Sequence, residues 1–468
     1  MLTFFRVNDP YRILGVFVLL LLIRLPYWVS DDHLTLPELN WMLLGERLAE
    51  GRRLYSGVWD NTGPLSAGVY WIIEWLFDRR QWVYALLATL VTTYQSLVFN
   101  DFLRARKAYR ESTYVPALVF VLLTSFSFDF YTLSPVLLAL TWILLAFRNA
   151  LHKIEGTLRD TQILRTGIYL GIAALFYLPS LVFTLPTFYA YMLFASLSPR
   201  RSLLLLYGTL LPFLLSFTYF YIVGTSSGFV DQYLLAFNHL ANNHYVSGLS
   251  LLMIVGVALV FFILALYKIT RYRRFTIQQT QLQQVMFMNV IVALVSIFLV
   301  RELAPFHLLL FVPPFAFFIT HFLLNIKRLL WAEIATISLT ILLPLSGYMF
   351  LFNYFSINQI AHTEAMMVHP TAYDELVAGK KVLVLGDNMS IYRHAKLATP
   401  YLNWQLASAQ LTHVDYFDNL SEVYDNFTSD MPDLIIDQSS LMPMISERIP
   451  AIRNTYRQGS TADVYVKQ

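Results

Sequence analysis

The sequence predicts an all-α polytopic membrane protein of about eleven transmembrane helices, followed by a small water-soluble α/β domain. Of 468 residues, 57% are hydrophobic and only 13% are charged, whereas an ordinary soluble domain is about 25% charged. The mean hydropathy is +0.54. The net charge of +3 is too small to indicate a nucleic-acid partner, and the lack of cysteine excludes disulfides and thiolate metal sites.

Eleven apolar runs are interpreted as spans across a hydrocarbon core roughly 30 Å thick. A further run, 64–78, is shorter and carries Glu74 with two tryptophans, so it either spans the membrane or lies in the interface. The predicted spans lie near 11–29, 81–100, 113–127, 131–147, 166–181, 182–197, 202–224, 249–267, 285–300, 304–324 and 329–352.

The loop charges decide between these alternatives, because cytoplasmic loops are rich in Lys and Arg. If 64–78 does not span, one side receives every basic loop that follows, and the other receives the Lys/Arg-free loop 225–248 and the C-terminal region. We therefore predict a cytoplasmic N-terminus, an external (periplasmic) C-terminal domain and an interfacial helix at 64–78. The membrane is predicted to be the cytoplasmic (inner) membrane. The basic residues are Arg104, Arg106, Lys107, Arg110, Arg148, Lys153, Arg159, Arg165, Arg200, Arg201, Lys268, Arg271, Arg273, Arg274, Lys327 and Arg328.

This topology makes residues 30–80 a long first external loop. Within it, 37–50 (PELNWMLLGERLAE) begins with Pro and Glu and is followed by Gly51, which are signals of a helix start and end. Its leucines and Met42 fall mostly on one face, which predicts an amphipathic helix at the membrane surface. Two surface helices are costly to order in a mere connection, so the loop is predicted to hold a site.

The loop resembles the N-terminal signature of the GT-C-fold membrane glycosyltransferases, which include the protein mannosyltransferases and the aminoarabinose transferases. A second stretch, RELAPFHLLLFVPPFAFF (301–318), resembles a late segment of the same superfamily. The resemblance covers the N-terminal third well, residues 285–325 moderately, and the middle spans by topology only. The matching loop residues are Trp41, Gly51, Leu54, Tyr55, Asp60, Gly63, Pro64 and Leu65.

The resemblance implies transfer of a sugar from a polyprenyl-phosphate donor, with a cation that offsets the growing charge on the leaving phosphate. It assigns Arg301, His307, Asp60 and Tyr55 to substrate binding. Each has a plainer alternative: Arg301 snorkels to the interface or pairs with Glu302, His307 is an ordinary interfacial histidine, and Asp60 holds an Asx turn.

The resemblance also implies an external carboxylate that accepts the acceptor's proton. In the alignment with the superfamily's pattern, the leading catalytic acid of the superfamily coincides with Pro37 and the second acidic position with Glu38. Asp31 and Asp32 lie a few residues upstream. Asp31, Asp32 and Glu38 are therefore the catalytic candidates. The alternatives are a solvated acidic cap for the aspartates and a first-turn carboxylate favoured by the helix dipole for Glu38. Without a base, the chain is a non-catalytic relative.

The C-terminal region is more polar, which predicts a domain boundary between 1–352 and 353–468. Buried strands at 380–387 and 433–437 and an edge strand at 462–467 are separated by helical stretches at 418–427 and 441–449, the pattern of a small α/β domain.

The leading hypothesis is a glycosyltransferase that acts on the external face with a polyprenyl-phosphate lipid donor. The alternative is a catalytically silent GT-C-like subunit that scaffolds a cell-envelope complex with other membrane subunits. A transporter is disfavoured because ionisable residues are nearly absent from the spans. Membrane lipids are expected partners, no nucleic acid is expected, and no cofactor is assigned. A divalent cation stays open, because the resemblance includes enzymes with and without one.

Overall fold

The computed structural model describes most of the chain, and its contacts divide the chain into two compact units. We call them the membrane unit (Met1–His33, Trp82–Ser216 and His244–Ala365) and the loop–sheet unit (Leu34–Gln81, Phe217–Asn243 and Met366–Gln468). Most of the predicted first loop thus belongs to the same unit as the C-terminal region. The predicted domain boundary after residue 352 stays a prediction. The described residues are 1–30, 33–151, 159–195, 198–240, 244–271, 275–354, 362–459 and 461–468.

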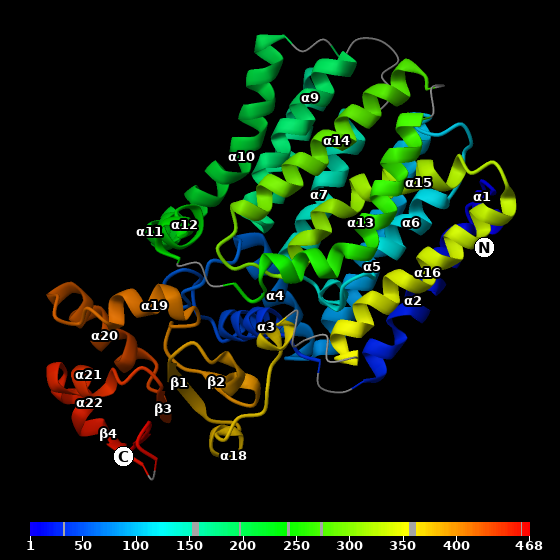
Figure 1. Ribbon diagram of the computed structural model, residues 1–468. Coiled ribbons are helices and arrows are strands. Elements are labelled where there is room, and N and C mark those ends of the chain that lie inside the picture. The colour runs from blue at the N-terminus through cyan, green and yellow to red at the C-terminus, as the bar shows by residue number, and fades with distance from the viewer. Residues whose placement is uncertain are drawn as a thin grey trace. The chain divides into compact units, whose positions relative to one another are not determined.

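Seven helical segments among the described residues are long and apolar enough to cross a membrane, and each coincides with a predicted span. In the membrane unit, α14 packs against α9, and α13 packs against α15 and α16 (Figure 1). The seven segments are α2 (Arg12–Val29), α5 (Gln81–Ala105), α10 (Pro199–Val223), α13 (Gly248–Arg271), α14 (Ile277–Phe298), η4 (Pro305–Phe311) with α15 (Val312–Leu324), and α16 (Leu329–Leu351).

The other four predicted spans coincide with shorter helices. These are α6 (Val115–Leu123), α7 (Pro135–Ala150), α8 (Asp160–Phe176) and α9 (Thr184–Ala195), with 9, 16, 17 and 12 residues. A mostly helical fold is confirmed, and the number of eleven spans stays a prediction. Further short helical segments are α1 (Leu2–Arg6), η1 (Phe128–Tyr131), η2 (Leu178–Phe183), α11 (Ser226–Gly228), η3 (Phe229–Leu234), α12 (Ala236–His239) and η6 (Thr363–Met366).

Glycines let α8 and α10 approach closely inside the membrane unit. Gly167 and Gly171 lie one turn apart on α8, and Gly208 lies on α10. A Cβ atom added to Gly208 would stand 2.6 Å from the backbone oxygen of Leu164, and Cβ atoms on the other two would also collide with α10 backbone oxygens. Small residues serve this purpose in membranes, where lipid gives helices no hydrophobic drive to associate.

The loop–sheet unit contains the two helices predicted in the first loop, α3 (Leu36–Ala49) and α4 (Pro64–Phe77). They cross closely at Gly45, where an added Cβ would stand 2.7 Å from the backbone oxygen of Tyr70. Trp41 stacks on the Tyr70 ring with centroids 5.9 Å apart. Burial of α3 extends to polar positions such as Arg47, so this helix is covered more fully than the single apolar face predicted from the sequence.

The C-terminal region forms a five-stranded sheet of order β2-β1-β3-β5-β4. Strands β2, β1 and β3 are parallel, and β5 runs antiparallel to both β3 and β4. The elements are α18 (Asp374–Val377), β1 (Lys381–Leu385), η7 (Met389–Arg393), β2 (Lys396–Leu397), α19 (Trp404–Leu411), α20 (Phe417–Ser429), β3 (Leu434–Asp437), α21 (Met442–Arg448), α22 (Pro450–Thr455), β4 (Tyr456–Gln458) and β5 (Val464–Lys467).

The predicted small sheet with intervening helices is confirmed, but the edge-strand prediction for 462–467 is wrong. β5 has a partner on each side, and the edge belongs to the three-residue β4. Side chains from alternate strand positions, such as Leu383, Leu385 and Ile435, build one core with α19–α22. In Figure 1 the colours of this region run from gold at α18 and β1 through orange at α19 to red at α22.

We expect Gly208→Ala to destabilise the membrane unit by about 1–3 kcal/mol, because the new methyl group forces α8 and α10 apart. The matched control is Gly256→Ala on α13, where an added Cβ has no atom within 4 Å. There, alanine should be neutral or stabilise the helix by about 0.5–1 kcal/mol. Thermal unfolding of the purified proteins in one detergent makes the comparison, and equal melting temperatures would contradict the close approach.

Candidate active site

The carboxylate of Glu38 lies in the first turn of α3 and is fully buried. Thr35 caps the helix, with its hydroxyl accepting from the Glu38 backbone N–H at 3.4 Å. The side-chain amide of Gln81 donates to Glu38 Oε2 at 2.9 Å. Glu38 therefore sits where the helix dipole favours a negative charge. The other two predicted catalytic residues, Asp31 and Asp32, lie outside the described residues.

Asp60 is buried in the turn-rich connector between α3 and α4. It accepts hydrogen bonds from the Asn40 side-chain amide at 3.2 Å and from the Thr62 backbone N–H at 3.1 Å. Burial raises the pKa of Asp60, and the bonds from Thr62 and Asn40 oppose that rise. A bond to the backbone two residues on is the pattern of an Asx turn. Its role in substrate binding stays a prediction.

Tyr55 fastens the connector inside the loop–sheet unit. Its φ of 66° is in the left-handed region, and its hydroxyl donates to the Thr62 backbone oxygen at 2.8 Å. Gln232 donates to the Tyr55 backbone oxygen at 2.9 Å, and the Phe220 ring packs with its centroid 5.3 Å away. The hydroxyl and the ring of Tyr55 therefore stabilise the connector. Substrate contact by Tyr55 stays a prediction.

A second pair of carboxyl groups, which the sequence analysis did not single out as a site, lies on the two loop helices. Burial, together with the charge of Glu46 on α3, raises the pKa of Glu74 on α4 to about 7. Burial also raises the pKa of Glu46, against the opposing charge of Arg79. The Arg79 guanidinium lies 3.5 Å from Glu46 Oε2. A carboxyl that titrates near neutral pH is suited to proton transfer.

Arg79 also ties the end of this helix pair to the C-terminal region. Its guanidinium donates to the backbone oxygens of Tyr392, Arg393 and Ala395 at 2.6, 3.2 and 3.1 Å. These carbonyls belong to η7 and the turn before β2. Arg79 therefore both pairs with Glu46 and holds the loop helices against the backbone from η7 to β2.

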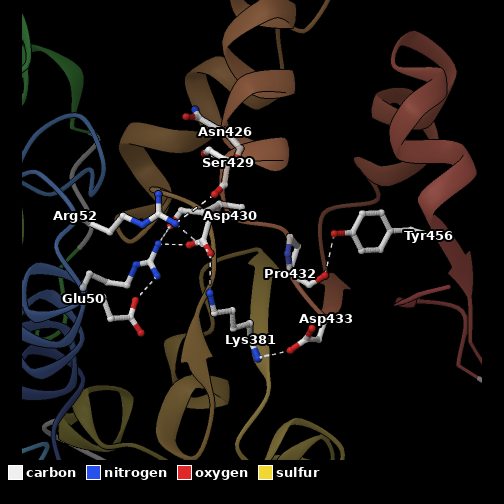
Figure 2. A network of polar contacts seen from close by, with 11 residues as sticks. Glu50, Arg52, Lys381, Asn426, Ser429, Asp430, Pro432, Asp433 and Tyr456 are labelled. Atoms are coloured by element: carbon white, nitrogen blue, oxygen red, sulfur yellow. Dashed lines mark hydrogen bonds and ion pairs between the residues drawn. The ribbon is translucent and has the colours of Figure 1, made fainter.

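A buried ion-pair network joins α3 to the same sheet (Figure 2). Arg47, only 1% exposed, donates to Asp430 and to Glu50, the latter at 2.6 Å. Asp430 also accepts from the Lys381 ammonium at 2.9 Å and faces Arg52 at 3.4 Å. Burial alone would raise the pKa of Asp430, but the bonds from Lys381 and Arg47 outweigh it, so the pKa is lowered.

In the membrane unit, the two residues predicted to contact the donor phosphate lie just before η4 and within it. Arg301 is half-buried between α14 and η4, and His307 is buried within η4. His307 Nδ1 lies 2.9 Å from the Tyr177 hydroxyl, and Nε2 lies 3.1 Å from the backbone oxygen of Glu302. Both ring nitrogens are therefore engaged by the protein. Phosphate contact by Arg301 and His307 stays a prediction.

Two further charged residues of the membrane unit, Asp129 and Arg24, are also buried. Asp129 in η1 accepts from the Phe306 backbone N–H at 2.6 Å, which braces the start of η4. Arg24 of α2 is fully buried and donates to the Thr89 and Thr92 hydroxyls and to the Phe130 backbone oxygen, at 2.9, 3.3 and 3.3 Å. Arg24 is an exception to the expected scarcity of charges within the spans.

The helical bundle, the helical first loop and the C-terminal α/β region together are the fold of the GT-C membrane glycosyltransferases, as the resemblance predicted. The chain is similar to crystal structures of ArnT from Cupriavidus metallidurans. For ArnT bound to undecaprenyl phosphate the TM-score is 0.56 at 11% identity, covering 98% of each chain. For apo ArnT the TM-score is 0.59 at 12% identity, covering 97% of each chain.

The apo oligosaccharyltransferase of Archaeoglobus fulgidus is also similar, with a TM-score of 0.50 at 11% identity over 96% of this chain and 73% of that one. No family model and no curated protein sequence matches the chain. The fold and the apolar helices make it a multi-pass membrane protein. Within the described residues, no group of three or more His, Cys, Asp or Glu side chains is arranged to hold a metal ion.

We expect the stability of the protein to fall as the pH rises from 4.5 through about 7, because folded Glu74 keeps its proton over this interval and an unfolded glutamate does not. Above that interval the ionised carboxylate costs about 1 kcal/mol after solvent screening. Glu74→Gln should remove this part of the pH dependence. Glu375→Gln, at an exposed position of α18, is the control. Melting temperatures measured across this pH range decide the matter: parallel wild-type and Glu74→Gln curves would contradict the raised pKa.

Proposed function

We propose that this protein is a glycosyltransferase that moves a sugar from a polyprenyl-phosphate donor to an acceptor on the external, periplasmic face of the inner membrane. The observation that carries the proposal is the end-to-end likeness to ArnT in complex with undecaprenyl phosphate, in which 98% of each chain is covered. The buried carboxyl groups of the first loop support it, since transfer to a hydroxyl or amine needs a proton acceptor.

The topology that we propose has eleven spans, a cytoplasmic N-terminus and α4 lying in the external interface. Its 14 residues extend about 21 Å, short of the roughly 30 Å hydrocarbon core. One side of α4 exposes Trp71, Ile72, Trp75 and Leu76. Tryptophans concentrate at membrane interfaces, where an apolar ring with a polar N–H is favoured. This exposed face supports an interfacial α4.

In the proposed reaction, an acceptor heteroatom forms a bond to the anomeric carbon of the sugar while the bond from that carbon to the phosphate oxygen breaks. The polyprenyl phosphate leaves with the bonding electrons, and a carboxylate takes the acceptor's proton. Asp31, Asp32 and Glu38 are the proposed bases, with Glu74 as a further candidate. Arg301, assisted by His307, is proposed to hold the phosphate, because a guanidinium can bind two of its oxygens at once.

A second candidate function is a silent GT-C-like subunit that scaffolds a membrane complex. The observation that favours it is Pro37, which occupies the position where the resemblance expects the leading acid. The second acidic position, Glu38, is hydrogen-bonded by Gln81 and fully buried. A chain that had lost its base would retain the fold, the loop helices and the lipid contact, but not sugar transfer.

We expect at least one of Asp31→Asn, Asp32→Asn and Glu38→Gln to lower sugar transfer about a hundredfold or more, the usual effect of removing a general base. Glu74→Gln is tested beside them. The assay incubates purified protein with native membranes from cells that lack it, which supply both the glycolipid donor and the acceptor, and follows release of polyprenyl phosphate by mass spectrometry. If all four variants at wild-type protein levels keep full activity, the proposed bases are wrong. If wild type itself releases none, the silent subunit is favoured.

We expect Arg301→Gln to reduce the polyprenyl phosphate that copurifies with the protein about tenfold, because a charge-assisted phosphate contact is worth about 1.5–3 kcal/mol. Arg200→Gln is the matched control, since that arginine is 90% exposed at the start of α10. Quantitative lipid mass spectrometry measures the ratio of lipid to protein. Equal retention in both variants would remove Arg301 from the proposed donor site.

A further inference from the structure

A cavity of about 780 Å³ lies in the membrane unit at the ends of three candidate spans. Lys268 and Arg271 belong to the last turn of α13, His321 lies in the last turn of α15, and Leu329 begins α16. By the loop-charge prediction these are cytoplasmic ends, so the cavity lies across the membrane from the proposed sugar transfer. Its position at the helix ends is the level at which lipid headgroups meet water.

The lining of this cavity is strongly cationic. Arg6, Arg110, Lys268, Arg271 and Lys327 line it, and Glu111 is the one carboxylate among the described lining residues. Five positive charges and one negative charge leave a net charge of +4. Arg6 holds Glu111 by two bonds of 2.5 and 2.6 Å, so the carboxylate is already engaged. The cations come from four separate stretches of sequence that converge on one concave surface.

A buried imidazole in the lining distinguishes this cavity from an ordinary group of basic loops. His321 lines it, is 3% exposed, and its Nε2 has no hydrogen-bond partner in the described structure. The rings of Tyr109, Phe317 and Phe275 pack around it at 4.6, 4.8 and 5.7 Å between centroids. Basic loops alone satisfy the positive-inside rule, and they require neither a cavity nor a buried polar atom without a partner.

We propose that this cavity binds the phosphate headgroup of an anionic phospholipid. Its volume is within the roughly 300–1,000 Å³ of small-molecule sites, which exceeds what a lone phosphate ion needs. Basic pockets between transmembrane helices on the cytoplasmic side suit such headgroups, because each cation near the surface adds to the attraction. Leu324, Ile326 and Leu329 supply an apolar edge for the glycerol and the start of the acyl chains. The site is separate from the proposed transfer chemistry and holds whether or not that chemistry occurs.

The test titrates the full-length protein in neutral detergent with short-chain phosphatidylglycerol and with short-chain phosphatidylcholine, and follows the apparent dissociation constant. We expect phosphatidylglycerol to bind at least about tenfold more tightly, and Arg110→Gln/Arg271→Gln to abolish most of that difference. The matched control, Arg159→Gln/Arg165→Gln, removes the same charge from the same predicted side but away from the cavity. It should change the constant less than about twofold.

Two additional variants protect the test against a folding defect. Lys327→Gln lies at an exposed position between α15 and α16, and His321→Phe keeps a ring against Tyr109 while removing the nitrogens. Both should weaken phosphatidylglycerol binding without lowering the melting temperature. Equal weakening by the control pair would reduce the effect to general surface charge and overturn the site. Glycerol 3-phosphate or inorganic phosphate binding as tightly as the lipid would overturn the lipid assignment.

Discussion

The buried ion pair between Arg47 and Asp430 is the constraint on which the loop–sheet unit depends. Both side chains are nearly inaccessible to water, and they lie 383 positions apart in the sequence. Removing one partner of such a pair leaves an uncompensated charge and costs about 3–5 kcal/mol. Neither α3 nor the α20–β3 connection can therefore move without the other. The pair specifies where α3 lies more than it adds net stability, since a buried pair barely repays its desolvation.

This constraint reaches the candidate site because α3 carries two of its carboxyl groups. Glu38 is in the first turn of that helix, and Glu46 precedes Arg47 directly. Arg79 extends the attachment from Glu46 to the η7 carbonyls. These two carboxyl groups are thus held by contacts to a region that follows them by more than three hundred residues. Groups held in this way need little reorganisation, and in the proposed reaction this would meet the condition for electrostatic preorganisation.

The sequence predicted those elements whose own residues carry a period or a charge bias. Strand β1 is a continuous apolar run, and the long spans need only length and hydropathy to be recognised. Strands β2 and β4 have only two and three residues, too few to show the alternating pattern of a strand. For this reason the sequence predicts an edge strand at β5 and misses β4. The burial of Arg47 and the raised pKa of Glu74 depend on neighbours from other elements. Neither could therefore be predicted from the local sequence around these residues. The resemblance supplied the fold and the positions to inspect.

Charge in a poorly solvated place is handled in three physical ways in this chain. Arg24 keeps its charge inside α2 by donating to two threonine hydroxyls and a carbonyl, and by lying 5.1 Å from the centre of the Tyr131 ring. Arg47 keeps its charge through a carboxylate. Glu74 instead keeps a proton up to about pH 7. Of the three side chains, only Glu74 changes its charge near physiological pH. Of these three groups, Glu74 is therefore the one whose environment suits it to exchange a proton with a bound substrate.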